Sequence, residues 1–93
     1  MSQELKKDAG KNRMDLIPPS WVIKDGEVLT FGQSKGYKEN SWRQVDPKRY
    51  RAALLRHLFA YLEGNITDRE SGLEHLAHVR VNAGFLMELG NES

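Results

Sequence analysis

The sequence predicts a single, predominantly helical domain. Two long segments, 46–64 and 67–90, carry helix signals at their ends and together cover nearly half of the 93 residues. A chain of this length supports one modest core, which buries roughly 60–65% of the unfolded surface. The remainder is a polar segment at 1–17, an ambiguous apolar segment at 20–31 and the glycine-containing loop that follows it.

The composition excludes several classes of protein. With 14 basic and 13 acidic residues the net charge is +1, whereas nucleic-acid and membrane-surface binders usually carry a large basic excess. The absence of cysteine rules out disulfides, thiolate metal sites and cysteine nucleophiles. No apolar run is long enough for a membrane span or a signal peptide. We therefore expect a soluble cytoplasmic protein with no membrane or nucleic-acid partner.

The N-terminal segment is polar and becomes apolar at "DLIPP". Its basic residues surround Gly10: Lys6, Lys7, Lys11 and Arg13. Positive charge beside a flexible glycine can bind phosphates, although a solvated tail has the same composition. The pair Pro18-Pro19 predicts an extended approach to a new element.

The segment 20–31 has two interpretations. The local pattern "WVIK-DG-EVLTF" slightly favours a β-hairpin, with Asp25-Gly26 as its type I′ turn. In a helix, Ser20 would be the N-cap, Trp21 and Val28 would belong to the apolar stripe, and Gly26 would cost about 1 kcal/mol.

The helix at 46–64 begins with Asp46 as N-cap and Pro47 at the first helical position, and it stops near Gly64. One apolar face comprises Tyr50, Ala53, Leu54, His57, Ala60 and Tyr61. A second stripe on roughly the opposite side comprises Leu55, Phe59 and Leu62. A helix that is apolar on two sides is either central in its bundle or covered again in a dimer.

The helix at 67–90 is expected to open with a capping box, Thr67 at N-cap and Glu70 at N3, and to end at Gly90. Four polar side chains share its apolar face with Val79, Phe85, Leu86 and Leu89: Ser71, His75, His78 and Asn82. These polar residues therefore fall in the stripe that should be buried.

The three histidines of the chain, His57, His75 and His78, all lie on the apolar faces of these two helices. Consecutive helices with a short link pack antiparallel, so the rings could converge. Converging imidazoles can hold a metal, bind phosphate or act as acid and base; each could equally be a neutral, hydrogen-bonded core histidine. Glu70 and Glu74 could add the carboxylates that Mg²⁺ prefers, or could be a capping residue and a solvated position.

Four stretches together resemble the phage-borne family described as the N-terminal domain of dATP/dGTP diphosphohydrolases: "KDAGKNRMDLIPP", "LTFGQSKGYKENSW", "RYRAALLRHLFAYLEGN" and "ESGLEHLAHVRVN". The resemblance covers roughly residues 7–89. That family is similar to the all-α nucleoside triphosphate pyrophosphatases of the MazG type. It implies an all-α, oligomeric helical bundle with an irregular N-terminal segment, and hence a helix rather than a hairpin at 20–31.

MazG-type enzymes hold Mg²⁺ or Mn²⁺ on Glu-x-x-Glu and Glu-x-x-Asp helices and cleave between the α and β phosphates. This sequence departs from that pattern. It has His75-Leu76-Ala77-His78 in place of Glu-x-x-Asp and Arg56-His57 in place of a glutamate pair. The family's asparagine before the loop tryptophan is replaced by Ser41, with Asn40 one place earlier. The usual carboxylate cage is therefore largely missing.

The resemblance implies conversion of a purine dNTP to a monophosphate and pyrophosphate, with Mg²⁺ or Mn²⁺ as cofactor, in the host cytoplasm. The expected catalytic residues are His57, Glu70 and His78, and the expected metal ligands are Glu70, His75 and His78. The expected substrate-binding residues are Lys11, Arg13, Tyr37, Trp42, Arg56 and Asn82. Tyr37 and Trp42 could stack on a base, although loop aromatics are more often anchors.

Two other functions stay open. The chain could bind and sequester a nucleotide, such as a host defence signal, without turning it over. It could also be an interaction module whose histidines form a buried polar network that fixes helix register.

Overall fold

The computed structural model describes residues 9–90, and within them every regular element is helical. Three α-helices follow one another: α2 (Pro19–Ser34), α3 (Pro47–Leu62) and α4 (His75–Gly90). Two short 3₁₀ turns, η1 (Met14–Leu16) and η2 (Ser41–Gln44), precede α2 and α3. The all-α class is confirmed.

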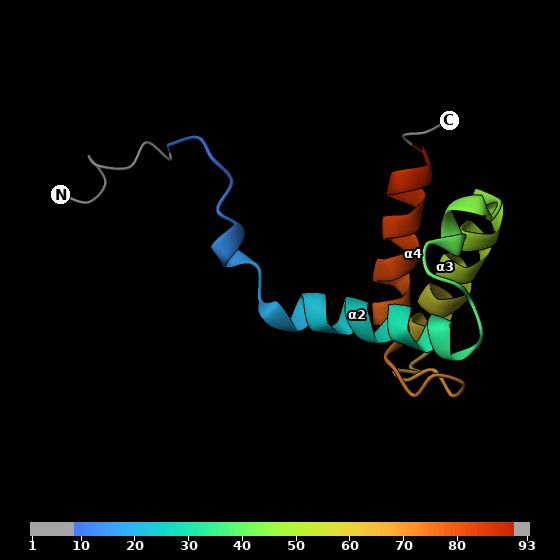
Figure 1. Cartoon of the computed structure of the whole chain (residues 1–93). Coiled ribbons are helices and arrows are strands. Elements are labelled where there is room, and N and C mark those ends of the chain that lie inside the picture. Colours follow the sequence, from blue (N-terminus) through green and yellow to red (C-terminus); the bar gives the residue numbers. More distant parts are fainter. Residues whose placement is uncertain (1–8, 91–93) are drawn as a thin grey trace.

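Helix α4 is the central helix. It lies beside α3 and is crossed near its N-terminal end by α2, whose first half projects away from the other two helices (Figure 1). The radius of gyration is 16.8 Å, against about 12 Å for a compact chain of this length. The fold is therefore open, with one arm that its own chain leaves largely uncovered.

The segment 20–31 is helical, which confirms the prediction from the family and not the local hairpin pattern. Two contacts with α4 decide the conformation. Asp25 accepts two hydrogen bonds of 2.9 Å from the guanidinium of Arg80, and Val28 is buried against Ala77 and Val81. A hairpin turn at Asp25 would break both contacts, so tertiary packing overrides the local preference.

The proline pair, and not the predicted serine cap, sets the start of α2. Ile17 and Pro18 are extended, Pro18 is the N-cap, and the helix begins at Pro19. Ser20 therefore lies inside the helix, and its predicted capping role is wrong.

Helix α3 begins as predicted, with the Asp46 carboxylate accepting a 2.9 Å hydrogen bond from the backbone N–H of Lys48. Its face toward α4 is half-buried, whereas Leu55, Phe59 and Leu62 are 43%, 56% and 67% exposed. Of the two predicted explanations for its second apolar stripe, a central position within the monomer is therefore wrong.

The predicted capping box at the start of the last helix is also wrong. The helix begins at His75, and residues 67–74 form a tight loop joined by an isolated antiparallel bridge between Thr67 and Glu74. Two backbone hydrogen bonds of 2.8 Å, Asp68 N–H to Leu73 C=O and His75 N–H to Ile66 C=O, close this loop. Gly72 has φ +73°, a left-handed conformation in which a side chain would be strained.

Across the described residues, no helix is both long and apolar enough to cross a bilayer.

Candidate functional site

The three histidines converge where α3 meets the start of α4. His75 and His78 are buried, with 9% and 7% of their surface exposed, and His57 of α3 is half-buried. The Nδ1 atoms of His57 and His75 are 2.8 Å apart, so one ring donates a hydrogen bond to the other. The rings of His57 and His78 stack with centroids 4.3 Å apart and planes within 8°. The polar stripe predicted on the buried face of α4 is confirmed for His75, His78 and Asn82, whereas Ser71 lies in the loop before this helix.

The tight loop adds a carboxylate and a hydroxyl to this cluster. Asp68 Oδ2 accepts hydrogen bonds of 2.9 Å from both the backbone N–H and the hydroxyl of Ser71. The same hydroxyl oxygen lies 2.7 Å from His78 Nε2 and accepts a 3.1 Å bond from the N–H of Leu73. We call His57, Asp68, Ser71, His75 and His78 the histidine cluster.

The hydrogen bonds of Ser71 fix the tautomer of His78. A serine hydroxyl has one proton, and an ionised carboxylate can only accept. The proton therefore goes to Asp68, and His78 must carry its own proton on Nε2 and donate it to Ser71. The order Asp68–Ser71–His78 places serine in the middle, so it is no Ser-His-Asp nucleophile triad.

The cluster favours neutral rings beside an ionised acid. Burial lowers the pKa of His57 to about 4, and the neighbouring His78 adds to the shift. Burial also lowers the pKa of His78, although the Asp68 carboxylate opposes the shift. For Asp68 burial would raise the pKa, but the hydrogen bonds from Ser71 outweigh it and the pKa lies below its usual value. At neutral pH the rings of His57 and His78 are therefore uncharged, which leaves each with one nitrogen lone pair.

Three members of the cluster could share a metal ion. One ligand atom each from His57, Asp68 and His75 lies within 4.8 Å of the others. Imidazole nitrogen and carboxylate oxygen are ligands of transition metals.

The sequence matches one family over its whole length. Residues 1–93 match the model of the family described as "dATP/dGTP diphosphohydrolase, N-terminal". The chain belongs to this family. A protein named dATP/dGTP diphosphohydrolase from Salmonella phage PMBT28 is 32% identical over 87 residues, which cover 94% of the chain and 30% of that relative. The chain thus spans less than a third of the length of the relative it matches. No solved structure matches it.

Glu70, which the sequence predicts as a metal ligand, lies outside the histidine cluster. Its side chain is 66% exposed, and its carboxylate accepts a 3.0 Å hydrogen bond from Lys35 at the end of α2. Asp68, two residues earlier, supplies the carboxylate of the cluster instead. The reason is the tight loop: in a helix Glu70 would share a turn with Thr67, whereas the loop turns Asp68 inward.

The predicted phosphate-binding residues of the N-terminal segment lie far from the cluster. Lys11 and Arg13 precede the projecting end of α2 (Figure 1), and the Arg13 guanidinium donates two 2.8 Å bonds to Asp15. Lys6 and Lys7 lie outside the described residues. Arg56, next to His57, is exposed, and its charge contributes to lowering the pKa of His57.

Of the two residues predicted to stack on a base, Trp42 packs against α4 and Tyr37 is exposed to solvent. Trp42 stacks on Phe85 of α4 with centroids 4.8 Å apart, and Tyr50 donates a 3.1 Å bond to the backbone carbonyl of Trp42. Trp42 therefore anchors η2, about 10 Å further along α4 than His78. Tyr37 is 60% exposed.

Asn82 is buried, but it does not orient a histidine ring. Its Nδ2 donates a 2.8 Å bond to the backbone carbonyl of His78, one turn earlier in α4. The amide thus supports the helix beneath the cluster.

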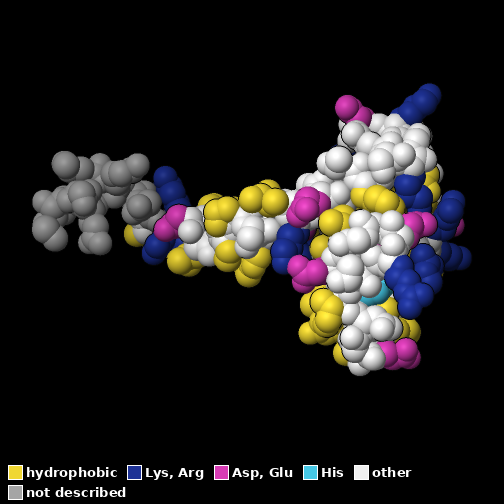
Figure 2. Space-filling model, turned by 90° about the horizontal axis from the view of Figure 1, so that it is seen from below, with side chains coloured by type: hydrophobic (Ala, Val, Ile, Leu, Met, Phe, Trp, Pro, Cys, Tyr) yellow, Lys and Arg dark blue, Asp and Glu magenta, His cyan; other side chains and the backbone are white. Residues whose placement is uncertain are grey.

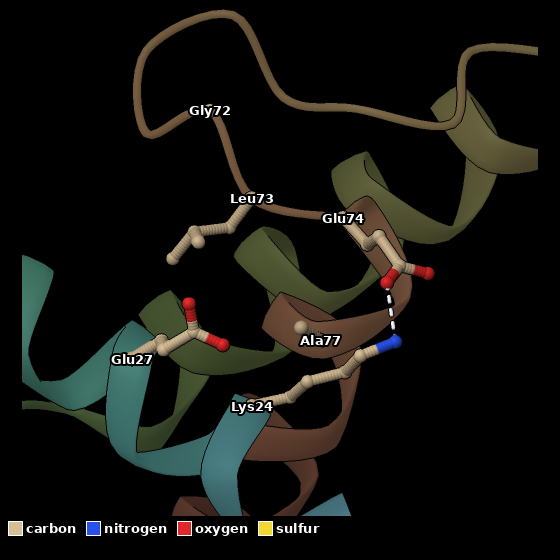
Figure 3. Close-up of a pocket in the computed structure, with 6 residues that line it drawn as sticks. All are labelled: Lys24, Glu27, Gly72, Leu73, Glu74 and Ala77. Carbon is tan, nitrogen blue, oxygen red and sulfur yellow. Dashed lines mark hydrogen bonds and ion pairs between the residues drawn. The ribbon is translucent and has the colours of Figure 1, made fainter. Parts of the chain in front are cut away.

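Two hollows flank the tight loop. An open groove of about 570 Å³ runs along α2 to the loop, lined by Ile23, Gly26, Glu27, Thr30, Phe31, Ser34, Ser71 and Leu73. A smaller pocket of about 150 Å³ lies between Lys24, Glu27 and Glu74, where Lys24 and Glu74 form an ion pair (Figure 3). Only the groove includes a member of the histidine cluster, Ser71, so it is the better approach to the site. In the view of Figure 2, a histidine surface is visible beside basic side chains.

Sequence reasoning missed Asp68 and Lys35. Asp68 lies in a loop for which a helical wheel gives no information, and Lys35 is the C-cap of α2, a segment whose local pattern favours a hairpin. The glycine at position 72, two residues after the supposed N3, was the available signal that the chain turns there.

Proposed function

We propose that the chain is the nucleotide-handling domain of a phage-encoded pyrophosphohydrolase that converts dATP or dGTP to the monophosphate and pyrophosphate in the host cytoplasm. The observation that carries the proposal is the histidine cluster: buried, converging polar groups in a chain whose family is named for dATP/dGTP diphosphohydrolases. A core of this size has little reason to bury His75 and His78 beside a half-buried His57 and Asp68 unless these groups do chemistry.

The cluster suits hydrolysis at a phosphorus atom. The neutral imidazole of His78 accepts a proton from the attacking water, and the oxygen of that water bonds to the α-phosphorus as the pyrophosphate oxygen leaves. Asp68 and Ser71 hold His78 in one tautomer, which fixes the ring nitrogen that is free to act. A positioned acid–base group of this kind typically contributes about 100- to 10,000-fold in rate.

The charges around the cluster suit a triphosphate. Arg56 is adjacent to His57 on α3, and Lys35 lies beside the loop with its ammonium 5.5 Å from the Phe31 ring. The groove along α2 offers Phe31 and Leu73 as an apolar surface for the base. In this arrangement Arg56 keeps its predicted phosphate-binding role, and Lys35 takes the role predicted for Lys11 and Arg13.

The cofactor implied by the MazG resemblance fits only in part. Mg²⁺ demands oxygen ligands in a near-octahedral arrangement, and the cluster offers one carboxylate with two imidazoles. Mn²⁺ tolerates mixed ligands better, but no step of the proposal depends on either ion.

A second candidate is a domain that binds a nucleotide without turning it over. The single carboxylate of the cluster favours it, because the acidic cage of MazG-type enzymes is absent from the described residues.

The oligomer expected from the sequence stays part of the proposal. The described core has only four buried apolar residues, while Leu55, Phe59 and Leu62 on α3 and Val22 and Ile23 on α2 are 43–67% exposed. A second copy packed on these faces would cover a surface that a stable monomer normally hides.

The test is product analysis. Purified protein is incubated with each dNTP in the presence of Mg²⁺, Mn²⁺ or Zn²⁺, and the products are separated by anion exchange. The proposal expects monophosphate and pyrophosphate in equal amounts from a purine dNTP. Unchanged nucleotide with measurable binding would favour the second candidate, and neither turnover nor binding would contradict both.

A further inference from the structure

We infer that His57, Asp68 and His75 form a binding site for a borderline transition-metal ion of the Zn²⁺ class, and that this site discriminates against Mg²⁺. The ligand set differs from the one that the sequence predicts, since Asp68 and His57 replace Glu70 and His78. The inference concerns binding alone and holds whether or not the protein turns over a nucleotide.

The two facing ring nitrogens carry the argument. His57 Nδ1 and His75 Nδ1 are 2.8 Å apart, and in this arrangement a single proton occupies the space between two lone pairs. A tetrahedral metal bonded to both nitrogens at 2.0–2.1 Å would place them about 3.3 Å apart. The two nitrogens must therefore move apart by about half an ångström for the ion to replace that proton. His57 on α3 is half-buried and so less enclosed than the buried His75.

The carboxylate is already oriented for such an ion. Asp68 Oδ2 is held by the N–H and hydroxyl of Ser71, while no described residue donates a hydrogen bond to Oδ1. A carboxylate fixed through one oxygen with the other available is how groups behind metal ligands usually orient them. The loop itself is rigid, because backbone bonds from Asp68 to Leu73 and from His75 to Ile66 close it.

The chemistry of the ligands selects the ion. Two imidazole nitrogens and one carboxylate suit Zn²⁺, Co²⁺ and Ni²⁺, whereas Mg²⁺ prefers oxygen ligands throughout. Three protein ligands also leave a fourth position open, as in catalytic zinc sites, where a water or a phosphate oxygen can bind.

The experiment titrates the chelator-stripped full chain with Co²⁺ and follows the visible absorption bands of the ion, then displaces Co²⁺ with Zn²⁺ or Mg²⁺. The expected result is one ion per chain, with Zn²⁺ at least about 100-fold tighter than Mg²⁺. Asp68→Asn and His75→Gln should each weaken Zn²⁺ binding by at least about 10- to 100-fold. Glu70→Gln and Glu74→Gln are matched controls that should leave it unchanged.

A measurement on the wild-type protein guards against variants that fail to fold. Long-range ¹⁵N–¹H spectra of the histidine rings should show Zn²⁺ shifting Nδ1 of His57 and His75 and leaving the protonated Nε2 of His78 in place. Equal affinity for Mg²⁺, Zn²⁺ binding that survives both Asp68→Asn and His75→Gln, or Zn²⁺ that leaves the two Nδ1 resonances unmoved would each overturn the inference.

Discussion

Both faces of α3 carry apolar residues, but only the inner face is half-buried, and it also carries a histidine. Its inner face places His57 against His75 and His78 of α4, so ionisable groups are buried. Its outer face presents Leu55, Phe59 and Leu62 to solvent. An ordinary surface helix buries its apolar stripe and exposes its polar residues.

Each face therefore calls for its own explanation. Buried imidazoles cost desolvation energy, and titratable groups in such surroundings are concentrated at sites that act on a ligand. Large exposed apolar patches often mark a surface that another molecule covers. The inner face is the proposed site and the outer face is the proposed contact with a second copy. Separate substitutions can test the two roles independently.

The largest effect is expected from the inner face. His78→Gln should reduce hydrolysis of the purine dNTP by at least about 100-fold, because it removes a proton acceptor that Asp68 and Ser71 orient. The measurement is initial rate by anion exchange, with circular dichroism to confirm the helical content. Turnover within a few-fold of wild type would remove the histidine from the mechanism.

On the outer face, Phe59→Asp should weaken self-association by about 30-fold, as loss of a central apolar anchor does at other interfaces. Light scattering coupled to size exclusion over a concentration series measures the shift to monomer. Gln44→Asp, on the exposed η2 turn, introduces the same charge and should leave the oligomer intact. A wild-type protein that is monomeric at all concentrations would contradict the second-copy explanation of this face.

Removal of the Ser71 hydroxyl, which links the tight loop to α4, is expected to have a smaller effect. Ser71→Ala removes the bonds from the hydroxyl to Asp68 and His78, and it should lower the free energy of unfolding by about 1–2 kcal/mol. In a domain of this size that loss lowers Tm by roughly 4–15 °C in thermal unfolding. Ser34→Ala, whose hydroxyl bonds only its own helix on an exposed surface, is the control. Equal losses for the two variants would show that Ser71 organises nothing beyond its own turn.

The smallest expected effect is the pH dependence of the inner face. The pKa of His57 falls to about 4 in the folded state, below its usual 6.5, so the unfolded chain binds a proton more readily. The stability that this shift provides is complete above pH 6.5 and is lost as pH falls toward 4, by about 1 kcal/mol after solvent screening. Urea unfolding in the presence of chelator at pH 7 and pH 5 measures it. His57→Gln should flatten the dependence, and an unchanged slope in that variant would assign the pH effect to other groups.

Much of the helical framework could be predicted from the sequence because its signals are local. Asp46 and Pro47 start α3 where expected, and the wheel of α3 separates its two faces correctly. The shared stripe of His75, His78 and Asn82 on α4 follows from spacing alone, and all three are buried.

What failed depended on contacts between distant segments. The hairpin turn predicted at Asp25-Gly26 does not form, because Asp25 in a helix pairs with Arg80, which lies 55 residues away. The capping box predicted at Thr67 and Glu70 does not form, because non-helical backbone hydrogen bonds close a loop there. In that loop Asp68, and not Glu70, reaches the histidine cluster. The distance of Lys11 and Arg13 from the cluster depends on where the N-terminal segment lies, which no local pattern predicts.

The central claim is that the histidine cluster receives the nucleotide. Its most direct test is titration of the ¹⁵N-labelled chain with dGTP, observed through the ring nitrogens of the three histidines. We expect the His57, His75 and His78 resonances to shift together and to saturate with one affinity, in wild type and in Gln44→Asp alike. Histidine resonances that stay in place while backbone amides elsewhere respond to dGTP would contradict it.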